Sequence, residues 1–487
     1  MKTPESICIV GGGSSGLIAA MILKQRFNIP VIIIKSKSIG TIGVGEGSTE
    51  HWKEFMDFVG LDHYELIKET NATYKAGLMF ENWRSDGKPF FHAVGVPFAN
   101  RYSQYKYIFA NQIAKNDPYM QYDYFWNNRL PKHFLGKSNE WPVNQFHFDT
   151  NKLNDYLTKK AKEMGIDFFD DEIIKLNFDN EGYIKSLKGK QYTYEYDFYI
   201  DCTGFKRLLI DQLGAKWKSY SKYLKMNSAI VFPTGDEENY NAWSLSKALD
   251  AGWRFKLPTY GRHGNGYIFD SNYITADQAK EEIEKDLGHE VDVKKHITFD
   301  TGAIDAPWIK NCVAIGLSCN FLEPLEASSI GTSLQQTFIL MHKIINYNDR
   351  IIKDYNKSVN DMTDNARDFV ALHYMTDKTN TQFWIDAANN KIPDSLAEKL
   401  EVWRYKLPIV EDFNHLSDYV LFSASNFTMV MDGLDLFDRE CIDRELSMHN
   451  YDLKGTAEKI IQEEKKWEKS IETISHKDFL STIRTYY

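Results

Sequence analysis

The chain has 487 residues, of which 43% are hydrophobic and 26% charged, as in an ordinary globular protein with a large core. Its net charge of -10 argues against nucleic acid as a partner, because neutralising phosphates needs clustered Lys and Arg. The five scattered cysteines form no CxxC pair, and no apolar run is long enough for a membrane span. We expect a cytoplasmic protein without a disulfide framework, a metal site or a membrane segment.

The first 35 residues predict a nucleotide-binding βαβ unit over 5–35. A short apolar run precedes a glycine cluster, an apolar helical stretch follows it, and a β-branched run spans 31–34. In such a unit, glycines allow a tight turn and a close approach of a pyrophosphate, while the helix start offers free N–H groups. The expected contacts with a dinucleotide are Gly11, Gly13, Ser14, Ser15 and Gly16.

The end of the second predicted strand departs from the usual pattern. An Asp or Glu at this place normally accepts hydrogen bonds from ribose hydroxyls, whereas this chain has Lys35 followed by Ser36. Because lysine accepts no hydrogen bond, either Ser36 replaces the acid or the ribose is held less firmly. We count both residues as cofactor contacts and expect a weaker affinity rather than a different cofactor.

Two segments further along the chain carry candidate chemistry. Residues 41–48 hold three glycines in eight positions, which suits a loop lying against a flat ring, although a plain flexible loop is the alternative. Lys75 follows among aromatic and small residues, in a setting unusual for a residue type that normally lies on the surface.

The segment 323–330 is the second candidate. It predicts a helix that begins at Pro324, so that Glu326 is favoured by the helix dipole alone, which is the structural explanation of this acid. The helix is expected to bury one apolar face made of Ile330, Leu334, Phe338, Met341 and Ile345.

Together with the N-terminal glycines, these segments resemble the flavin-dependent halogenases of the tryptophan-halogenase type. The resemblance covers nearly the whole chain and is weakest after residue 350. It implies an α/β fold of the FAD-hydroxylase type, with mixed β-sheets and a C-terminal helical subdomain. We expect an FAD-binding and catalytic domain over 1–345, with substrate-side insertions within 84–145 and 206–300, and a mainly helical substrate-covering subdomain over 346–487.

The resemblance also implies flavin contacts beyond the first glycine cluster. In the family, the loop over 41–48 is a strap over the flavin, and later turns close the nucleotide site. The additional contacts are Gly43, Val44, Gly45, Glu46, Gly47, Ser48, Gly204, Gly316 and Ile330. No second GxGxxG for a nicotinamide cofactor is evident, so FADH2 is expected from a separate flavin reductase, as in the family.

For the reaction, the resemblance implies that Lys75 and Glu326 are catalytic. The lysine would hydrogen-bond hypohalous acid formed at the flavin, or be halogenated itself to a haloamine. The carboxylate would orient the electrophile or accept the proton lost from the substrate, with Glu323 as the rival carboxylate. Backbone amides of Ser328 and Ser329 would hold the halide, which is chloride, bromide or iodide.

On the substrate side, His92 and Val94 align with a family segment that faces bound tryptophan. Val94 stands where an aromatic ring would stack, so we expect a roomier pocket that accepts diverse electron-rich arenes of indole or phenol type. Trp253, Phe255 and Pro258 stand where the family has WxWxIP, an element thought to screen the flavin; a buried aromatic strand is the equally simple alternative.

We therefore expect FADH2- and O2-dependent halogenation of an electron-rich aromatic compound. A flavin monooxygenase that oxygenates an aromatic substrate directly is the first alternative, and a non-catalytic flavin-binding protein is the second. The sequence is also compatible with a homodimer.

Overall fold

The computed structural model describes residues 2–37, 45–94, 105–116, 122–137, 139–413 and 420–487. Its nucleotide-binding half is built on a six-stranded sheet of order β21-β22-β13-β1-β2-β9, in which every pair except β21–β22 is parallel. The central strands are continuous apolar runs, as is usual for parallel strands covered on both faces. The strands are β1 (Ile7–Val10), β2 (Val31–Lys35), β9 (Asp167–Asp170), β13 (Phe198–Asp201), β21 (Trp308–Ile309) and β22 (Cys312–Ala314).

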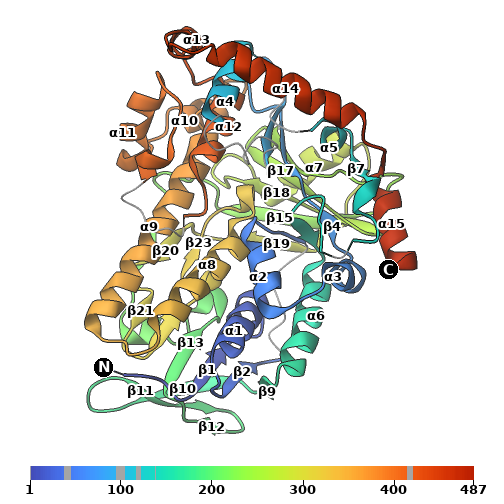
Figure 1. Cartoon of the computed structure of the whole chain (residues 1–487). Helices are drawn as coiled ribbons and strands as arrows, with labels where there is room; N and C mark the ends of the chain where they lie inside the picture. Colours follow the sequence, from blue (N-terminus) through green and yellow to red (C-terminus); the bar gives the residue numbers. More distant parts are fainter. Residues whose placement is uncertain (1, 38–44, 95–104, 117–121, 138, 414–419) are drawn as a thin grey trace.

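Helix α1 (Ser14–Arg26) connects β1 to β2 and confirms the βαβ unit predicted from the glycine cluster. It packs against α6 (Thr150–Glu163) and α8 (Ser328–Lys343), so its residues 17–23 are buried on every side (Figure 1). Helix α6 begins where Asp149 accepts hydrogen bonds from the first N–H groups of the helix. These three helices therefore hold the segments that border the nucleotide-binding end of the sheet.

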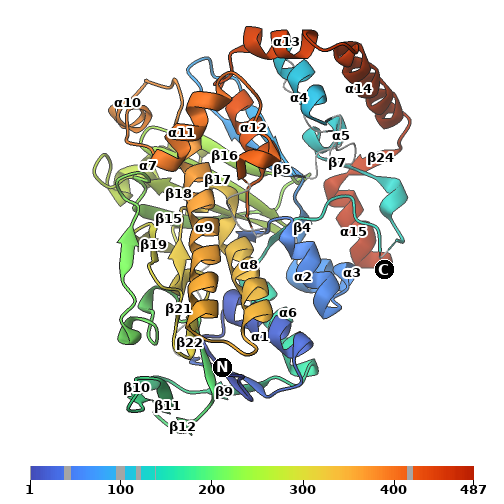
Figure 2. The same ribbon diagram turned by 60° about the vertical axis from the view of Figure 1, so that its left-hand side comes forward.

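The second large sheet has seven strands in the order β19-β15-β18-β17-β16-β5-β6 and is antiparallel except between β16 and β5. Figure 2 shows this sheet beside the long helix α9 (Asp349–His373). Helix α7 (Ala276–Leu287) packs on β15 and β18. The strands are β5 (Gly77–Glu81), β6 (Phe90–Ala93), β15 (Ser228–Thr234), β16 (Ser244–Leu249), β17 (Gly252–Thr259), β18 (Arg262–Phe269) and β19 (Lys295–Thr298).

Four small sheets accompany the two large ones in the described part of the chain. The one that matters for the site has the order β3-β8-β4, because it places the strap and the lysine segment on opposite edges of one strand. Its strands are β3 (Glu46–Gly47), β8 (Phe146–Phe148) and β4 (Thr73–Tyr74). The others are β10 (Ile173–Phe178) with β11 (Ile184–Gly189) and β12 (Thr193–Tyr194), β14 (Trp217–Ser219) with β20 (Gly302–Ile304) and β23 (Asn320–Phe321), and β7 (Arg129–Pro131) with β24 (Thr473–Ser475).

The remaining helices surround the sheets, and those after α8 form the C-terminal helical part (Figure 2). Helix α12 packs on strand β6 and on α9, and this packing places two parts of the site. The helices are α2 (His51–Val59), α3 (His63–Thr70), α4 (Tyr105–Ala114), α5 (Asp123–Trp126), α10 (Gln382–Ala388), α11 (Asp394–Trp403), α12 (Ala424–Gly433), α13 (Arg439–Ser447), α14 (Leu453–Lys469) and α15 (His476–Tyr486).

One expected helix differs from the prediction at both ends. Pro324 begins only a short 3-10 turn that ends at Glu326, and α8 starts at Ser328 after Ala327 adopts a left-handed backbone with φ of 54°. The predicted apolar face is wrong at Ile345, which lies beyond the helix and is 39% exposed. The prediction of a single buried face also fell short, because α8 is enclosed by other elements and buries its polar residues too.

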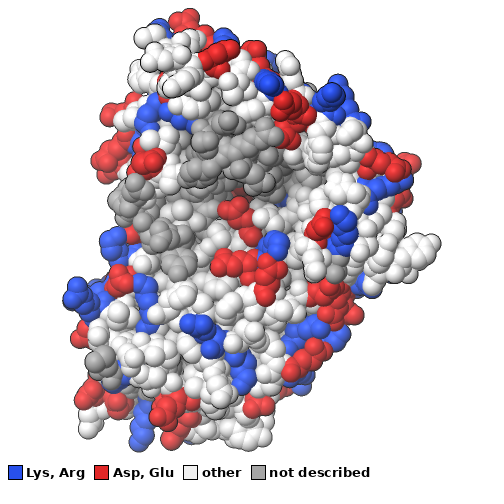
Figure 3. Space-filling model, viewed as in Figure 1, with Lys and Arg blue, Asp and Glu red and all other residues white. Residues whose placement is uncertain are grey.

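The described surface carries both charge signs interspersed rather than one basic or acidic patch on the face shown in Figure 3. Among the described residues, no helix combines the length and apolarity needed to cross a bilayer, and no group of His, Cys, Asp or Glu is arranged to hold a metal ion.

Candidate active site

A cavity of about 820 Å³ opens at the carboxyl ends of β1, β2 and β13, where open α/β sheets usually bind ligands. It is bordered by the β1–α1 turn, by α6 and by the first turn of α8. Most of the predicted cofactor contacts line it, and one predicted halide contact does as well. These residues are Gly11, Gly13, Ser14, Ser15, Gly16, Lys35, Ser36, Glu46, Gly204, Ser329 and Ile330.

Backbone geometry explains the glycines of the β1–α1 turn. Gly11 has a φ of +118°, and a Cβ on it would lie 2.1 Å from the carbonyl oxygen of Cys202. A Cβ on Gly16 would lie 2.0 Å from the carbonyl oxygen of Gly11, so only glycine lets α1 start this close to the turn. Gly13 caps α1 without a side-chain hydrogen bond and faces open space, which leaves the first N–H groups of the helix available. This cradle fits the pyrophosphate of FAD.

Other predicted cofactor residues do not line this cavity, and Gly43 and Val44 lie outside the described residues. Gly45, Gly47 and Ser48 belong to the part of the strap that leads away from the cavity towards Lys75. Gly316 lies behind the cavity wall with a φ of +69°, where its N–H donates to Gln336.

Lys35 closes one end of the cavity. Its side chain packs so closely on Gly12 that a Cβ there would lie 2.6 Å from Lys35 Cδ, and its Nζ lies 5.1 Å from the centroid of the Phe168 ring. Burial lowers the pKa of this ammonium, and Lys162 lowers it further. The lysine side chain offers no carboxylate acceptor for a ribose hydroxyl at position 35, as the sequence indicated.

We predict that Lys35→Glu tightens FAD binding roughly tenfold, because a carboxylate can accept ribose hydrogen bonds worth about 1 kcal/mol each. Calorimetric titration of the wild type and of Lys35→Glu with FAD gives the ratio of their dissociation constants. Lys35→Met is the matched control, since it removes the charge without adding an acceptor. Equal affinities for the Glu and Met variants would show that no ribose contact forms at position 35.

Strand β8 connects the strap with the lysine segment. Its residues pair with β3 on one edge (Glu46 opposite Phe148) and with β4 on the other (Tyr74 opposite Phe146). Ser48 N and Oγ both bond the backbone of Phe146, which fixes the end of the strap. The carbonyl of Ser48 consequently points to the far edge of this sheet, where Lys75 lies.

Lys75 is buried, with 1% of its surface exposed, so the alternative of a solvated surface lysine is wrong. Its Nζ donates to the carbonyl oxygen of Ser48 at 2.9 Å. A Cβ on Gly47 would lie 3.8 Å from this Nζ and 3.0 Å from the Cβ of Ala327, so the lysine, the strap and the loop before α8 meet here. Burial lowers the pKa of Lys75 to about 8, although the nearby charge of Glu326 acts in the opposite direction.

Glu326 lies on the other side of Ala327 and is 2% exposed. Its Oε1 contacts His92 Nδ1 and His373 Nε2, both at 2.9 Å, and within the described part of the chain its Oε2 contacts only His92 Nδ1, also at 2.9 Å. Burial alone would raise the pKa of this carboxyl, but the two imidazoles outweigh burial and lower it to about 2. The direction of this pKa shift favours the ionised carboxylate at neutral pH.

The rival carboxylate, Glu323, has a different environment. It is fully buried, accepts hydrogen bonds from Trp253 Nε1 and the Tyr374 hydroxyl, and has one oxygen without a partner. Burial raises its pKa to about 7. Two carboxyl groups three residues apart thus have pKa values shifted in opposite directions, and Glu326 is the one that bonds His92.

The two predicted halide residues open helix α8. Ser328 is buried and Ser329 is exposed towards the flavin-side cavity, and the capping residue Ala327 makes no side-chain hydrogen bond. The first N–H groups of α8 therefore remain available to an anion.

The predicted substrate residues fall into two groups. His92 and Val94 lie at the end of β6, where His92 is engaged by Glu326 at Nδ1 and by Asn426 at Nε2, and the Val94 N–H donates to the Ala76 carbonyl. Both ring nitrogens of His92 thus already have protein partners. The other group, Trp253, Phe255 and Pro258, lies on β17, and Pro258 accepts a hydrogen bond from Thr73 beside the lysine segment.

Sequence reasoning missed His373 and Asn426. His373 ends helix α9 and Asn426 lies in α12, so both come from the C-terminal helical part. Their contacts span 47 and 334 positions of the chain. The segment 425–433 resembles the family and was expected to cover the substrate site, but nothing in the sequence assigned a contact to Asn426 or to His373.

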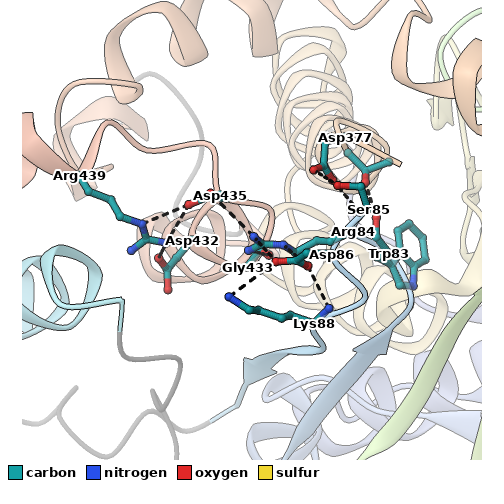
Figure 4. Close-up of polar contacts among 11 residues, drawn as sticks. Trp83, Arg84, Ser85, Asp86, Lys88, Asp377, Asp432, Gly433, Asp435 and Arg439 are labelled. Atoms are coloured by element: carbon teal, nitrogen blue, oxygen red, sulfur yellow. Dashed lines mark hydrogen bonds and ion pairs between the residues drawn. The ribbon is translucent and has the colours of Figure 1, made fainter. Parts of the chain in front are cut away.

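A second cavity of about 310 Å³ lies beside this cluster, between β6 and α12. Figure 4 shows that the cations around it are paired with acids: Arg84 and Lys88 bond Asp86, and Arg439 bonds Asp432 and Asp435. Arg84 also donates to the carbonyl oxygen of Gly433 at the end of α12. These contacts connect the turn before β6 with α12. Strand β6 carries His92, and α12 carries Asn426.

A family model described as tryptophan halogenase matches residues 6–445 of the chain. The tryptophan 6-halogenase of Streptomyces toxytricini is 29% identical over 460 residues, which cover 84% of this chain and 86% of that protein. A flavin-dependent halogenase of Xanthomonas campestris superimposes with a TM-score of 0.86 at 27% identity, covering 99% and 98% of the two chains. A tryptophan halogenase of Shewanella frigidimarina shares the fold, with a TM-score of 0.89 at 23% identity over 100% and 98% of the chains.

Proposed function

The chain belongs to the tryptophan halogenase family of flavin-dependent enzymes, and from this premise we propose that Lys75 and Glu326 carry its halogen transfer to an electron-rich aromatic substrate. The observation that supports these roles is that Lys75 Nζ and the Cβ of Ala327, the residue after Glu326, both lie within 4 Å of the position of a Cβ on Gly47, and that the charge of Glu326 acts on Lys75. Lys75 is anchored there by the Ser48 carbonyl, and Glu326 is held ionised between two imidazoles.

When bound, FADH2 with O2 and halide supplies hypohalous acid. The Lys75 ammonium has three N–H donors, of which one is used by Ser48, so the others can hold the oxygen of hypohalous acid. The ring carbon then forms its bond to the halogen while the O–halogen bond breaks, and the leaving hydroxide takes a proton from Lys75. Water is released, and the halogenated ring carbon still carries its hydrogen.

Glu326 Oε2 takes that ring proton, because Oε2 contacts only His92 Nδ1 whereas Oε1 is shared by two imidazoles. Return of this proton to the Lys75 amine restores both groups. Halide would be held at the N–H groups that open α8, at Ser328 and Ser329, between this point and the flavin.

We further propose that a separate flavin reductase supplies FADH2. The only GxGxxG turn evident in the sequence is the one at the β1–α1 cradle, and it is used for FAD. We also propose a division of the chain near residue 345, with the helices after it, including α12, covering the substrate side.

Mass spectrometry for halogen incorporation tests the function. The protein is incubated with a flavin reductase, NADH, FAD, O2 and chloride, bromide or iodide in turn, together with a panel of indoles and phenols. We expect halogenated arenes that depend on every component. Oxygenated products without halogen incorporation would contradict the proposal and favour the monooxygenase alternative.

We predict that the enzyme shows no strong preference for free tryptophan, because Val94 stands where an aromatic ring would stack on the indole. Loss of such a stack typically forfeits about 0.5–1.5 kcal/mol, or roughly a factor of two to ten in affinity. Competition among tryptophan, a substituted indole and a phenol in one reaction measures the selectivity, and Val94→Phe should shift it towards tryptophan. Much faster reaction of tryptophan at a single ring position in the wild type would refute the interpretation of Val94.

A further inference from the structure

The hydrogen bonds of His373 determine its tautomer. Its Nδ1 lies 2.8 Å from the carbonyl oxygen of Phe369, and because a carbonyl only accepts, Nδ1 carries a hydrogen. Its Nε2 lies 2.9 Å from Glu326 Oε1. A neutral His373 would present a lone pair to a carboxylate oxygen there, which is repulsive. One proton must therefore lie between Nε2 and Oε1, and it makes either His373 an imidazolium or Glu326 an acid.

In the same way, the hydrogen bonds of Asn426 determine which ring nitrogen of His92 is protonated. The Oδ1 of Asn426 accepts from Ser423 N at 2.7 Å and from Ser423 Oγ at 2.9 Å, so the NH2 of this amide is the group that faces His92 Nε2 at 3.0 Å. An NH2 group only donates, hence His92 Nε2 is an acceptor and Nδ1 carries the hydrogen that bonds Glu326. A second proton on His92 would face the NH2 of Asn426, so His92 is held neutral.

We infer that His373 is a positioning residue that carries the proton of this pair as an imidazolium and thereby keeps Glu326 ionised for the transfer of the ring proton. The role given to the ionised Glu326 rests on the proposed function, but the location of the proton can be measured without turnover. A buried carboxylate needs a compensating charge close by, and of the two imidazoles that bond Glu326 only His373 can supply it.

The surroundings of the pair support this location. The rings of Phe80 and Phe369 lie 5.0 Å from His373, centroid to centroid, and bring no competing charge. Two further charged groups lie near the pair: Lys75, which follows β4, is near Glu326, and Glu50, which precedes α2, is near His92. Glu323 accepts a hydrogen bond from the Tyr374 hydroxyl, and burial raises its pKa to about 7, so its charge is only partial at neutral pH.

Nitrogen-15 NMR of histidine-labelled wild-type protein tests the inference directly. We expect one buried histidine with imidazolium shifts at neutral pH, which is lost in both His373→Gln and Glu326→Gln. Infrared difference spectra between wild type and Glu326→Gln should show no protonated-carboxyl band from Glu326. A neutral His373, or a protonated-carboxyl band that disappears with Glu326→Gln, would overturn the inference without touching the role of Lys75.

His373→Gln separates charge from hydrogen bonding, because the glutamine amide can still donate to Oε1 but holds no extra proton. Without the imidazolium the pKa of Glu326 rises, so the carboxylate is protonated over a wider acidic range. We expect halogenation to fall about tenfold per pH unit below the new pKa and to recover as the pH increases. FADH2 oxidation should stay at the wild-type rate. Full activity with an unchanged pH profile would overturn the inference, as would a loss of activity that is equal at every pH.

Discussion

Replacing Lys75 with alanine should abolish halogenated product, with a loss of at least about 10³-fold, while FAD binding and FADH2 oxidation by O2 stay near wild type. The side chain lies beyond the strap from the flavin-side cavity and does not line it, so it acts only on the halogenating species. A preorganised donor in a buried site contributes on the order of 10²–10³-fold, and here the same group also supplies a proton. Product is measured by mass spectrometry, and flavin oxidation by absorbance.

Lys75→Met is the matched variant, since it keeps the volume of a side chain that is 1% exposed and avoids a cavity. Both variants should release free hypohalous acid, which a small-molecule trap in solution detects. Halogenation within a few-fold of wild type in either variant would remove Lys75 from the mechanism.

The pH dependence of the wild type gives the protonation state of Lys75. Its pKa is lowered to about 8 by burial, so the ammonium predominates below that value and is lost above it. If the ammonium holds hypohalous acid, turnover at saturating substrate falls as the pH rises through about 8. A rise through the same range would assign the neutral amine and the haloamine route instead.

The sequence predicted the parts of this molecule whose determinants are local. The β1–α1–β2 unit follows from glycines that a short turn requires, and Gly11 and Gly16 show the close backbone contacts that forbid any other residue. Lys75 and Glu326 were identified from short motifs matching a family, and in the structure the charge of Glu326 acts on the pKa of Lys75.

The rest depends on contacts that no local pattern encodes. His373 and Asn426 reach the site only because α12 packs against β6, the strand that carries His92, and α9 packs against α12 and α8. The start of α8 was misplaced because Pro324 favours any helical turn, whereas the left-handed conformation of Ala327 separates the 3-10 turn from the helix. The opposite pKa shifts of Glu323 and Glu326 arise from their different partners, although the two residues are three positions apart.

Glu326→Gln should lower turnover by roughly 10²–10⁴-fold, the range that a positioned general base typically contributes. Glutamine preserves the local geometry, because its amide oxygen can accept from His92 Nδ1 and its NH2 can donate to a neutral His373 Nε2. The loss therefore reports the missing charge and proton acceptor rather than a collapsed site. Single-turnover assays with reduced flavin separate this step from the formation of hypohalous acid, which should be unaffected.

The same substitution should also shift the titration of Lys75. The charge of Glu326 raises the pKa of this lysine against the effect of burial. In Glu326→Gln the pKa of Lys75 is therefore lower, and the fall of the residual activity that occurs near pH 8 in the wild type should occur at a lower pH. Glu323→Gln is the matched control, because Glu323 is equally buried but bonds Trp253 and Tyr374. A large loss with Glu323→Gln and a small one with Glu326→Gln would exchange the roles of the two carboxyl groups. Equal losses would mean that the loop before α8, rather than one carboxylate, is what the substitutions disturb.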